Sequence, residues 1–261
     1  MGNTLLKIDR QELIKQILKK DGSILISDIS QQLDCSSETI RRDLLELEKQ
    51  GFAKKIYGGA YIPNEYDKSV PVSLRNTFFN EEKTRMAHCV LDFIKDGDTI
   101  FLDASSTCRR IAEVLIQVRR HITIITNSID IINSYHMDAD EHLICLGGFW
   151  NANNRAFQGI QTLSDVSNYT ANKAFISCPS VELEFGLTDN SQEAAAIRRS
   201  MLEHSRENFL VVDHTKFNSH SDFVISDVSK IDTIVTDCKI SDEWDIFCKN
   251  NEINVCYEPR N

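Results

Sequence analysis

Two adjacent arginines near the start of a short amphipathic segment have the most evident chemistry in the sequence. In the segment SSETIRRDLLELEKQG, Ile40, Leu44 and Leu47 recur at helical spacing, which predicts a helix with one buried face. At about 100° per residue, Arg42 points nearly opposite Ile40 and Arg41 lies on the flank. A guanidinium can pair bidentately with O6 and N7 of guanine. We therefore expect the polar amino end of this helix to contact the bases or phosphates of DNA.

Two shorter helical patterns precede this segment and would position it. Asp9 is placed to cap a first helix, Ser27 a second, and Ser36 the arginine-bearing third helix, which Gly51 would end. A short helix followed by a helix with basic and hydroxyl residues at its start is the helix-turn-helix arrangement, in which the second helix enters the major groove. A helical docking module with a solvated basic face is the alternative.

The chain after the third helix predicts a β-hairpin that carries two lysines. In FAKKIYGGAYI, two β-prone runs flank Gly58-Gly59, a pair suited to a two-residue turn with positive φ. Lys54 and Lys55 lie on the first arm, where they would contact phosphates. The polar stretch between Pro63 and Pro71 follows without helical or strand periodicity, and we place a linker there.

Composition and charge favour two globular domains. The chain has 261 residues, 41% of them hydrophobic and 26% charged, which excludes wholesale disorder. The formal charge of −10 is unevenly distributed. Residues 1–62 contain ten Lys and Arg and nine Asp and Glu, whereas the rest of the chain contains 19 Lys and Arg and 30 Asp and Glu. No apolar run approaches the ~20 residues that cross a bilayer, and the first residues lack the apolar region of a signal peptide. We expect a cytoplasmic protein.

The second part of the chain predicts an α/β domain. Short continuous apolar runs of the kind buried in parallel sheets alternate with helical patterns at 81–94, 108–118 and 193–205. The expected strands are 99–103, 122–126, 142–146, 173–177, 209–213 and 232–237. The predicted organisation is a helix-turn-helix with a hairpin at 1–62, a linker at 63–77, and a mostly parallel α/β domain at 78–261; the family resemblance given below implies that the first is a winged helix-turn-helix and that the last serves effector binding and oligomerisation.

Neither the cysteines nor the histidines predict a metal centre. The eight cysteines stand far apart with no CxxC pair, so we expect reduced thiols and no disulfide framework or zinc site. The one cluster with metal-like composition is His136, Asp138, Asp140, Glu141 and His142. Its spacing fits no common ligand pair, and an acidic loop before a strand explains it. We expect no metal and no cofactor.

The chain resembles the DeoR family of bacterial regulators of sugar metabolism. The strings S-x-x-T-I-R-R-D-L from Ser36 to Leu44 and G-G-A from Gly58 to Ala60 are specific to its winged helix-turn-helix. The second part continues the match in order through DGDTIFLDASST, ITNS, LGG, NKAF, FGLTD, EAAAIRRSM and VVDHTKF, to about Asp237. The resemblance implies double-stranded operator DNA as a partner. The expected DNA-binding residues are Ser36, Ser37, Thr39, Arg41, Arg42, Lys54, Lys55, Tyr57 and Gly58.

In that family the second domain resembles ribose-5-phosphate isomerase and binds phosphorylated sugars or related metabolites. The segment from Asp103 to Thr107 leaves a strand and opens a helix, so free amides and three hydroxyls can surround a phosphate at the positive end of the helix. Other loops after strands would converge on the same crevice. The effector-binding residues expected from these loops and from the resemblance are Asp103, Ser105, Ser106, Thr107, Asn127, Gly147, Gly148, Lys173, Arg198 and Lys216.

Three departures from the family pattern fall on this predicted site. Family members usually carry glycine in place of Ser105, arginine in place of Asn151, and a Gly-x-Asp/Ser-Gly turn in place of residues 177–180. A side chain at position 105 would stand where backbone approaches phosphate, and Arg155 is the nearest substitute for the missing cation. The altered turn, Ser-Cys-Pro-Ser, offers no carboxylate for the acid–base step of an isomerase.

The function expected from these features is a DNA-binding transcriptional regulator, a repressor of a carbohydrate operon that responds to a phosphorylated metabolite. A sugar-phosphate isomerase with an added amino-terminal domain and a protein-interaction adaptor are the alternatives. One winged domain buries only ~600 to 1,000 Å² on DNA, so we expect a homo-oligomer, a dimer or tetramer, that presents paired domains to spaced half-sites.

Overall fold

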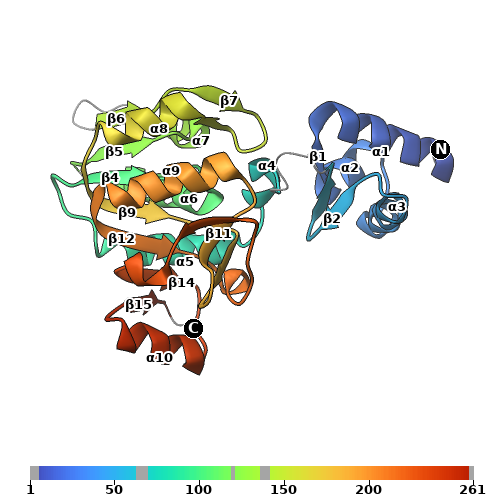
Figure 1. Cartoon of the computed structure of the whole chain (residues 1–261). Helices are drawn as coiled ribbons and strands as arrows, with labels where there is room; N and C mark the ends of the chain where they lie inside the picture. Colours follow the sequence, from blue (N-terminus) through green and yellow to red (C-terminus); the bar gives the residue numbers. More distant parts are fainter. Residues whose placement is uncertain (1–5, 63–69, 119–120, 136–141, 259–261) are drawn as a thin grey trace. The chain divides into compact units, whose positions relative to one another are not determined.

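The computed structural model describes residues 6–62, 70–118, 121–135 and 142–258, which form two compact units. The first unit spans Met1–Phe78 and the second Phe79–Asn261 (Figure 1). No helix among the described residues is long and apolar enough to cross a membrane.

The first unit contains three helices packed with a small antiparallel sheet, followed by a short fourth helix. Its elements are α1 (Lys7–Asp21), β1 (Ser23–Leu25), α2 (Ile26–Gln32), α3 (Ser37–Lys49), β2 (Lys54–Ile56), β3 (Gly59–Tyr61) and α4 (Val72–Arg75). The sheet has the order β1-β3-β2. Ile14 and Leu18 of α1 and Ile40, Leu44 and Leu47 of α3 are fully buried in one core, as their helical spacing predicts.

Two of the three predicted helix starts, those of α1 and α2, are wrong. Pairing between strands explains the start of α2. Helix α1 begins at Lys7, before Asp9, with Leu6 at the N-cap. Helix α2 begins at Ile26, before Ser27, because β1 pairs with β3 and fixes this point: the Ile26 amide donates to the Gly58 carbonyl at 2.9 Å. The start of α3 is confirmed, since the Ser36 side chain accepts a hydrogen bond from the Thr39 amide at 3.2 Å.

The hairpin forms, but its turn is shifted by one residue. Ile56 pairs with Gly59, so the two-residue turn is Tyr57-Gly58, and Gly58 has a φ of 77°. Gly59 belongs to β3, where a Cβ would come within 2.4 Å of the Ile24 carbonyl oxygen. The second glycine therefore serves the close approach of β1 instead of the turn.

The predicted linker at 63–77 contains described structure in its second part. Residues 63–69 lie outside the described residues. After them α4 packs against β1, with Val72 and Leu74 buried.

The second unit is built on a seven-stranded parallel sheet of order β15-β14-β12-β9-β4-β5-β6. The strands are β4 (Thr99–Leu102), β5 (Thr123–Thr126), β6 (His142–Cys145), β9 (Ala171–Ile176), β12 (Ser205–Val211), β14 (Thr233–Thr236) and β15 (Asn254–Tyr257). Six of them were predicted. The seventh, β15, comes from the carboxyl-terminal segment that no pattern assigned.

Helices cover both faces of this sheet (Figure 1). Neighbouring residues of one strand enter different cores: Ile100 and Leu102 pack with α5 (Asn80–Leu91), α6 (Ser106–Val118) and α7 (Ile129–Ser134), whereas Phe101 packs with α8 (Ile160–Ser167), α9 (Gln192–Glu203) and α10 (Asp242–Asn250). This alternation explains why the strands are apolar at nearly every position.

Two smaller sheets and two 3-10 turns complete the second unit. Strands β10 (Ser180–Glu182), β11 (Gly186–Asp189) and β13 (Phe223–Ser226) form an antiparallel sheet, and β7 (Phe149–Asn151) pairs with β8 (Ala156–Gln158) as a separate ribbon. The 3-10 turns are η1 (His214–Lys216) and η2 (Val228–Lys230).

Candidate nucleic-acid interface and polar site of the sheet

The amino end of α3 presents hydroxyl and basic side chains outward. The Ser36 hydroxyl caps the helix and lies 2.8 Å from that of Thr39. Arg41 and Arg42 are exposed, with 77% of the Arg42 side chain accessible, and both lie about one turn from Glu38 at 3.6 and 3.5 Å. Such exposed pairs are worth at most about 1 kcal/mol, so both guanidiniums can exchange Glu38 for another anion.

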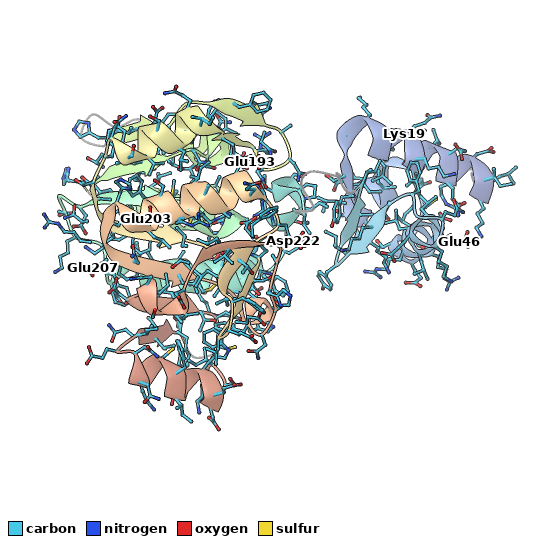
Figure 2. All side chains as sticks on the ribbon, viewed as in Figure 1. Lys19, Glu46, Glu193, Glu203, Glu207 and Asp222 are labelled. Carbon is cyan, nitrogen blue, oxygen red and sulfur yellow. The ribbon has the colours of Figure 1, made fainter. Side chains whose placement is uncertain are left out.

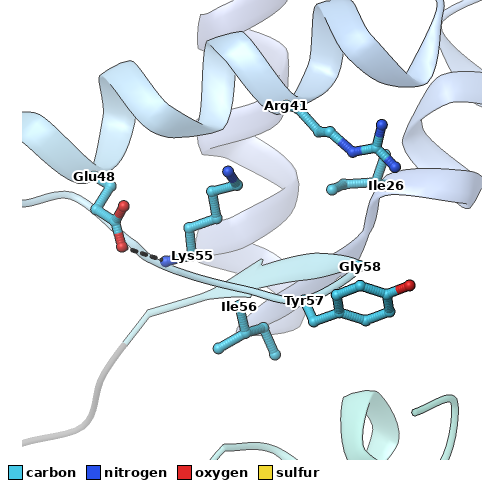
Figure 3. Close-up of a pocket in the computed structure, with 7 residues that line it drawn as sticks. All are labelled: Ile26, Arg41, Glu48, Lys55, Ile56, Tyr57 and Gly58. Atoms are coloured by element: carbon cyan, nitrogen blue, oxygen red, sulfur yellow. Dashed lines mark hydrogen bonds between the residues drawn. The ribbon is translucent and has the colours of Figure 1, made fainter. Parts of the chain in front are cut away.

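A cleft of about 520 Å³ lies between α3 and the β2–β3 hairpin (Figure 3). Arg41, Lys55, Tyr57 and Gly58 line it, together with Ile26, Glu48 and Ile56. The Lys55 amide donates to a Glu48 oxygen at 2.8 Å, which holds the hairpin against the end of α3 and leaves the Lys55 ammonium pointing into the cleft. The structure thus brings together four of the nine predicted DNA-binding residues. Lys54 is exposed on the same strand, and Ser37 contacts Ser30 at 3.5 Å.

A buried ion pair that orients α3 was missed from the sequence. Arg10 of α1 donates to Asp43 of α3 at 2.5 Å, and both side chains are at least nine-tenths buried. Gln11 donates to the other Asp43 oxygen at 3.1 Å. The hydrogen bond to Asp43 raises the pKa of Arg10 above its ordinary value. The acidic residue within the IRRDL string is therefore a structural residue, and its place on the buried side of the helix, beside Leu44, was the available signal.

The carboxyl ends of β4 and β9 meet at the point where the strand order reverses. From β4 the chain proceeds outward through β5 to β6, and from β9 it proceeds the other way through β12 and β14 to β15. Open α/β sheets bind ligands at this position. Here the Ser177 amide, after β9, donates to Asp103, after β4, at 3.1 Å.

A buried arginine holds two carboxylates beneath these loops. Arg198 of α9 donates to Asp103 and to Asp189, and all three side chains are more than nine-tenths buried. Burial opposes charge on Asp103, but Arg198 and the hydrogen bond from Ser105 outweigh it, so the pKa of Asp103 lies below its ordinary value. Likewise, burial opposes charge on Arg198 and the two carboxylates raise its pKa. Arg198 and Asp103 therefore neutralise each other within the protein, which differs from the expectation that Arg198 faces a ligand.

The first turn of α6 carries free donors in the same place. Ser105 accepts from the Cys108 amide at 3.0 Å through its hydroxyl, while its own amide donates to Asp103 at 3.0 Å. The amides of Ser106 and Thr107 have no hydrogen-bond partner within the part of the chain that the structure describes. The Ser177 hydroxyl lies 3.4 Å from that of Thr107. Two adjacent amides and nearby hydroxyls at a helix amino end are the groups that bind a phosphate.

The predicted obstruction by Ser105 is not seen in this geometry. Its hydroxyl is turned into the helix as an N-cap, so the side chain that replaces the family's glycine serves α6 itself. Nearby, burial raises the pKa of Cys178 to about 12, so this thiol stays neutral at physiological pH.

Asn127 lies beside this turn, because Leu102 and Thr126 are paired neighbours at the ends of β4 and β5. Asn127 is 97% buried, and its amide nitrogen donates to the Phe157 carbonyl at 2.8 Å. Its side-chain oxygen accepts no hydrogen bond from the described residues. An unsatisfied buried acceptor is costly and has a ready partner in a hydroxyl of a ligand.

Lys173 and Lys216 do not join this cluster. Lys173 lies within β9, opposite Ile100 and towards the amino ends of the strands, where it is buried and paired with Asp98 at 2.7 Å. Its expected place among the effector-binding residues came from the family resemblance, whereas the predicted strand 173–177 already placed Lys173 at an amino end, as β9 (Ala171–Ile176) does. Lys216 follows β12 in η1 and pairs with Asp213 at 3.4 Å.

The glycine pair after β6 has a packing role. Gly148 has a φ of 143°, and a Cβ there would lie 2.1 Å from the Thr162 hydroxyl oxygen. Gly147 faces open space, and its carbonyl accepts from Thr162 at 2.7 Å. Asn151 donates to Gln158 and accepts from the Asn154 amide within the β7–β8 ribbon, while Arg155 pairs with Asp130 at 2.6 Å. The proposed substitution of Arg155 for a cation at position 151 has no support in these contacts.

One group of possible metal ligands occurs among the described residues. His214, Asp237 and Cys238 place their ligand atoms within 4.8 Å of one another after β12 and β14. His214 Nδ1 lies 2.8 Å from Asp237 Oδ2, so these two groups satisfy each other without an ion. Of the rejected sequence cluster, residues 136–141 lie outside the described residues.

A winged helix-turn-helix followed by a parallel α/β unit with a polar site at its strand switch defines a transcription factor with a sensor domain. Family comparison gives the same answer: residues 10–66 match the DeoR-like helix-turn-helix domain, and residues 79–238 match the DeoR C terminal sensor domain. The chain belongs to the DeoR family of DNA-binding transcriptional regulators.

Characterised relatives match over nearly their full length. The HTH-type transcriptional regulator IolR of Bacillus subtilis is 29% identical, over 96% of this chain and 99% of its own. The lactose phosphotransferase system repressor of Staphylococcus epidermidis is 32% identical, over 88% of this chain and 92% of its own. The L-fucose operon activator of Haemophilus influenzae is 29% identical, over 94% of this chain and 97% of its own. Among solved structures, ribose 5-phosphate isomerase A of Methanocaldococcus jannaschii aligns at 17% identity and a TM-score of 0.38, over 52% of this chain and 53% of its own.

Proposed function

We propose that the chain represses a carbohydrate-metabolism operon by binding operator DNA through α3 and the β2–β3 hairpin. The cleft lined by Arg41, Lys55 and Tyr57 carries this proposal, because it places a base-reading guanidinium and a phosphate-binding ammonium on one surface. Relatives named for lactose, fucose and other sugar systems support the carbohydrate assignment.

The test of DNA binding uses the promoter region upstream of the gene that encodes this chain. Arg42→Ala should weaken operator binding by ~1 to 3 kcal/mol and relax base preference, whereas Lys55→Ala should weaken binding to every sequence and lower the salt slope by about one unit. Lys49→Ala is the matched control, since Lys49 is an exposed cation at the far end of α3. Equal operator affinity of wild type and an Arg41→Ala, Arg42→Ala double variant would refute the interface.

The polar site at the strand switch is proposed to bind the phosphate of a sugar or related metabolite. The free amides of Ser106 and Thr107 are the donors, the helix dipole of α6 favours the anion, and the Asn127 oxygen is positioned to accept from a ligand hydroxyl. Asp103 and Arg198 are proposed to hold the loops in place, since each already has a charged partner. Lys216 follows β12 at the carboxyl edge of the sheet, outside this cluster, and is paired with Asp213, so it is not proposed as a phosphate ligand.

A thermal-shift screen tests this site, with fructose 1-phosphate, fructose 6-phosphate and other sugar phosphates against fructose and inorganic phosphate. A ligand at 100 times its Kd stabilises the folded state by ~2.7 kcal/mol, which moves the melting temperature by several degrees. Thr107→Val and Ser106→Ala remove the hydroxyls and keep the backbone amides, so the double variant should reduce the shift, while Ser164→Ala, an exposed serine on α8, should keep it in full. A full shift in the double variant would show that these hydroxyls do not contact the ligand and would count against the site.

An isomerase activity is not proposed for this chain. The turn at 177–180 has no carboxylate, and the buried carboxylates of Asp103 and Asp189 both pair with Arg198, which leaves neither as a free proton acceptor. Absence of ribose-5-phosphate isomerisation by the purified chain is the expected result.

A further inference from the structure

The β7–β8 ribbon and the first turn of α8 expose three large apolar side chains. Phe149 is 79% exposed, Ile160 89% and Leu163 37%, and we call these three residues the apolar surface. Phe149 lies against the start of α8, because a Cβ placed on Gly159, the residue before Ile160, would lie 3.7 Å from that of Phe149. Trp150 faces the other side of the ribbon, where it packs edge-on against Phe157 at 5.8 Å. Phe149 and Ile160 are the members of the apolar surface that the described residues leave mostly uncovered.

The segment that carries the apolar surface has little charge. Residues 146–164 contain a single charged side chain, Arg155, and it is paired with Asp130. The face of α8 that carries Ile160 and Leu163 continues with Ser164 and Ser167 at helical spacing. The second unit as a whole is strongly acidic, with 28 Asp and Glu against 17 Lys and Arg. Glu193, Glu203, Glu207 and Asp222 are examples on its surface (Figure 2).

This distribution restricts what can bind there. Two copies of an acidic unit repel each other wherever acidic surfaces meet, and the segment 146–164 can meet a second copy without contributing a carboxylate. Phe149 and Ile160, both mostly exposed, provide roughly 300 Å² of apolar area. That is about a third of the ~800 Å² that each partner contributes to a standard interface, and depletion of charge is typical of an interface centre.

From these observations we infer that the apolar surface is the self-association interface, at which Phe149 and Ile160 of one chain contact a second copy across a twofold axis. A twofold interface uses the same surface on both chains, so an apolar and uncharged surface is complementary to itself. The inference does not depend on the identity of the effector or on its binding site. It also supplies the paired winged domains that specific operator binding needs.

Analytical ultracentrifugation of the full chain over a range of concentrations tests this interface. Ile160→Glu should raise the dimer dissociation constant by on the order of 100-fold, because it places two unpaired carboxylates in an apolar contact. The variant should still fold, since Ile160 is the exposed first residue of α8, where an acidic side chain is favourable. Phe149→Thr, which keeps a strand-forming residue, is the second variant. Ile246→Glu on α10, 60% exposed and outside the apolar surface, is the control.

The expected outcome is a wild type and an Ile246→Glu variant that associate equally, with Ile160→Glu and Phe149→Thr both shifted towards monomer. Far-UV circular dichroism and melting temperature would verify that each variant folds. A monomeric wild type at tens of micromolar, or association of Ile160→Glu and Phe149→Thr at wild-type strength, would overturn the inference. Retention of oligomers by these variants together with an unchanged sugar-phosphate response would count against this interface and leave the proposed effector site standing.

Discussion

At the scale of single residues, adjacent glycines after β6 differ in what they tolerate. Gly148 combines positive φ with close contacts to Thr162 and Gln158, whereas Gly147 has open space around its α-carbon. We expect Gly148→Ala to destabilise the second unit by more than about 2 kcal/mol, and Gly147→Ala to change its stability by less than about 1 kcal/mol. Urea unfolding followed by tryptophan fluorescence measures both changes, and equal losses in the two variants would contradict the packing role.

The buried carboxylate of Asp103 makes stability depend on acidity. Because its pKa in the folded state lies below the unfolded value of about 3.9, its contribution is fully present above that value and is lost as pH falls through the folded-state pKa. Asp103→Asn should cost ~3 to 5 kcal/mol at pH 7, since it leaves Arg198 with an unpaired buried charge. The deficit should shrink as the pH falls below about 4.

Urea unfolding at pH 7, 5, 4 and 3 measures this dependence. Asp242→Asn is the control, because the Asp242 side chain is almost fully exposed. A deficit for Asp103→Asn that is the same at pH 7 and pH 3 would show that the ion pair with Arg198 does not stabilise the fold. Because Asp103→Asn is expected to lower the free energy of unfolding, a loss of effector binding in this variant would not identify Asp103 as a ligand-binding residue.

At the scale of elements, the pair between Arg10 and Asp43 joins α1 to α3, the helix that we propose to contact DNA. Asp43→Ala should destabilise the first unit by ~3 to 5 kcal/mol, because it leaves the Arg10 charge buried without its partner. Glu46→Ala removes the exposed pair with Lys7 on the same two helices and should cost less than about 1 kcal/mol.

The two tryptophans allow this prediction to be checked for one unit at a time. Trp150 and Trp244 both lie in the second unit, so their fluorescence reports on that unit, whereas far-UV circular dichroism reports on both. Asp43→Ala should lower the circular dichroism transition of the helical first unit and weaken operator binding while the fluorescence transition stays in place. If Glu46→Ala lowered the circular dichroism transition by as much as Asp43→Ala, the stability of the first unit would not depend on the burial of the ion pair.

At the scale of the whole molecule, a DNA-binding unit and a sensor unit in one chain are linked thermodynamically. If a sugar phosphate changes operator affinity by some factor, operator DNA must change sugar-phosphate affinity by the same factor, commonly worth ~1 to 3 kcal/mol. We expect calorimetric titration of the sugar phosphate to give different dissociation constants with and without operator, matching the shift in operator affinity measured by fluorescence anisotropy. Unequal factors would mean that the two measurements report different oligomeric states.

Local patterns in the sequence were sufficient for the class of the protein and for most of its elements. The period of the apolar residues in α3, the Ser36 cap and the continuous apolar strands are local features, so the winged helix-turn-helix and the parallel α/β unit could be predicted from them. The DeoR motifs gave the family, and the strand-to-helix turn from Asp103 to Thr107 gave the position of the polar site.

Contacts between distant segments decided the rest. Strand β1 and the start of α2 depend on pairing with β3, and Gly59 is required by the approach of Ile24 from another strand. Arg198 was expected to face a ligand, but α9 directs it onto Asp103. Lys173 was expected at the effector site by family resemblance, but β9 places it beside Asp98. Burial and ion pairing are set by which elements pack together, and the exposure of Phe149 and Ile160 is set in the same way. The sequence by itself therefore determined which chemical groups are present, and the tertiary structure decided which of them are already satisfied within the protein and which are free to bind a partner.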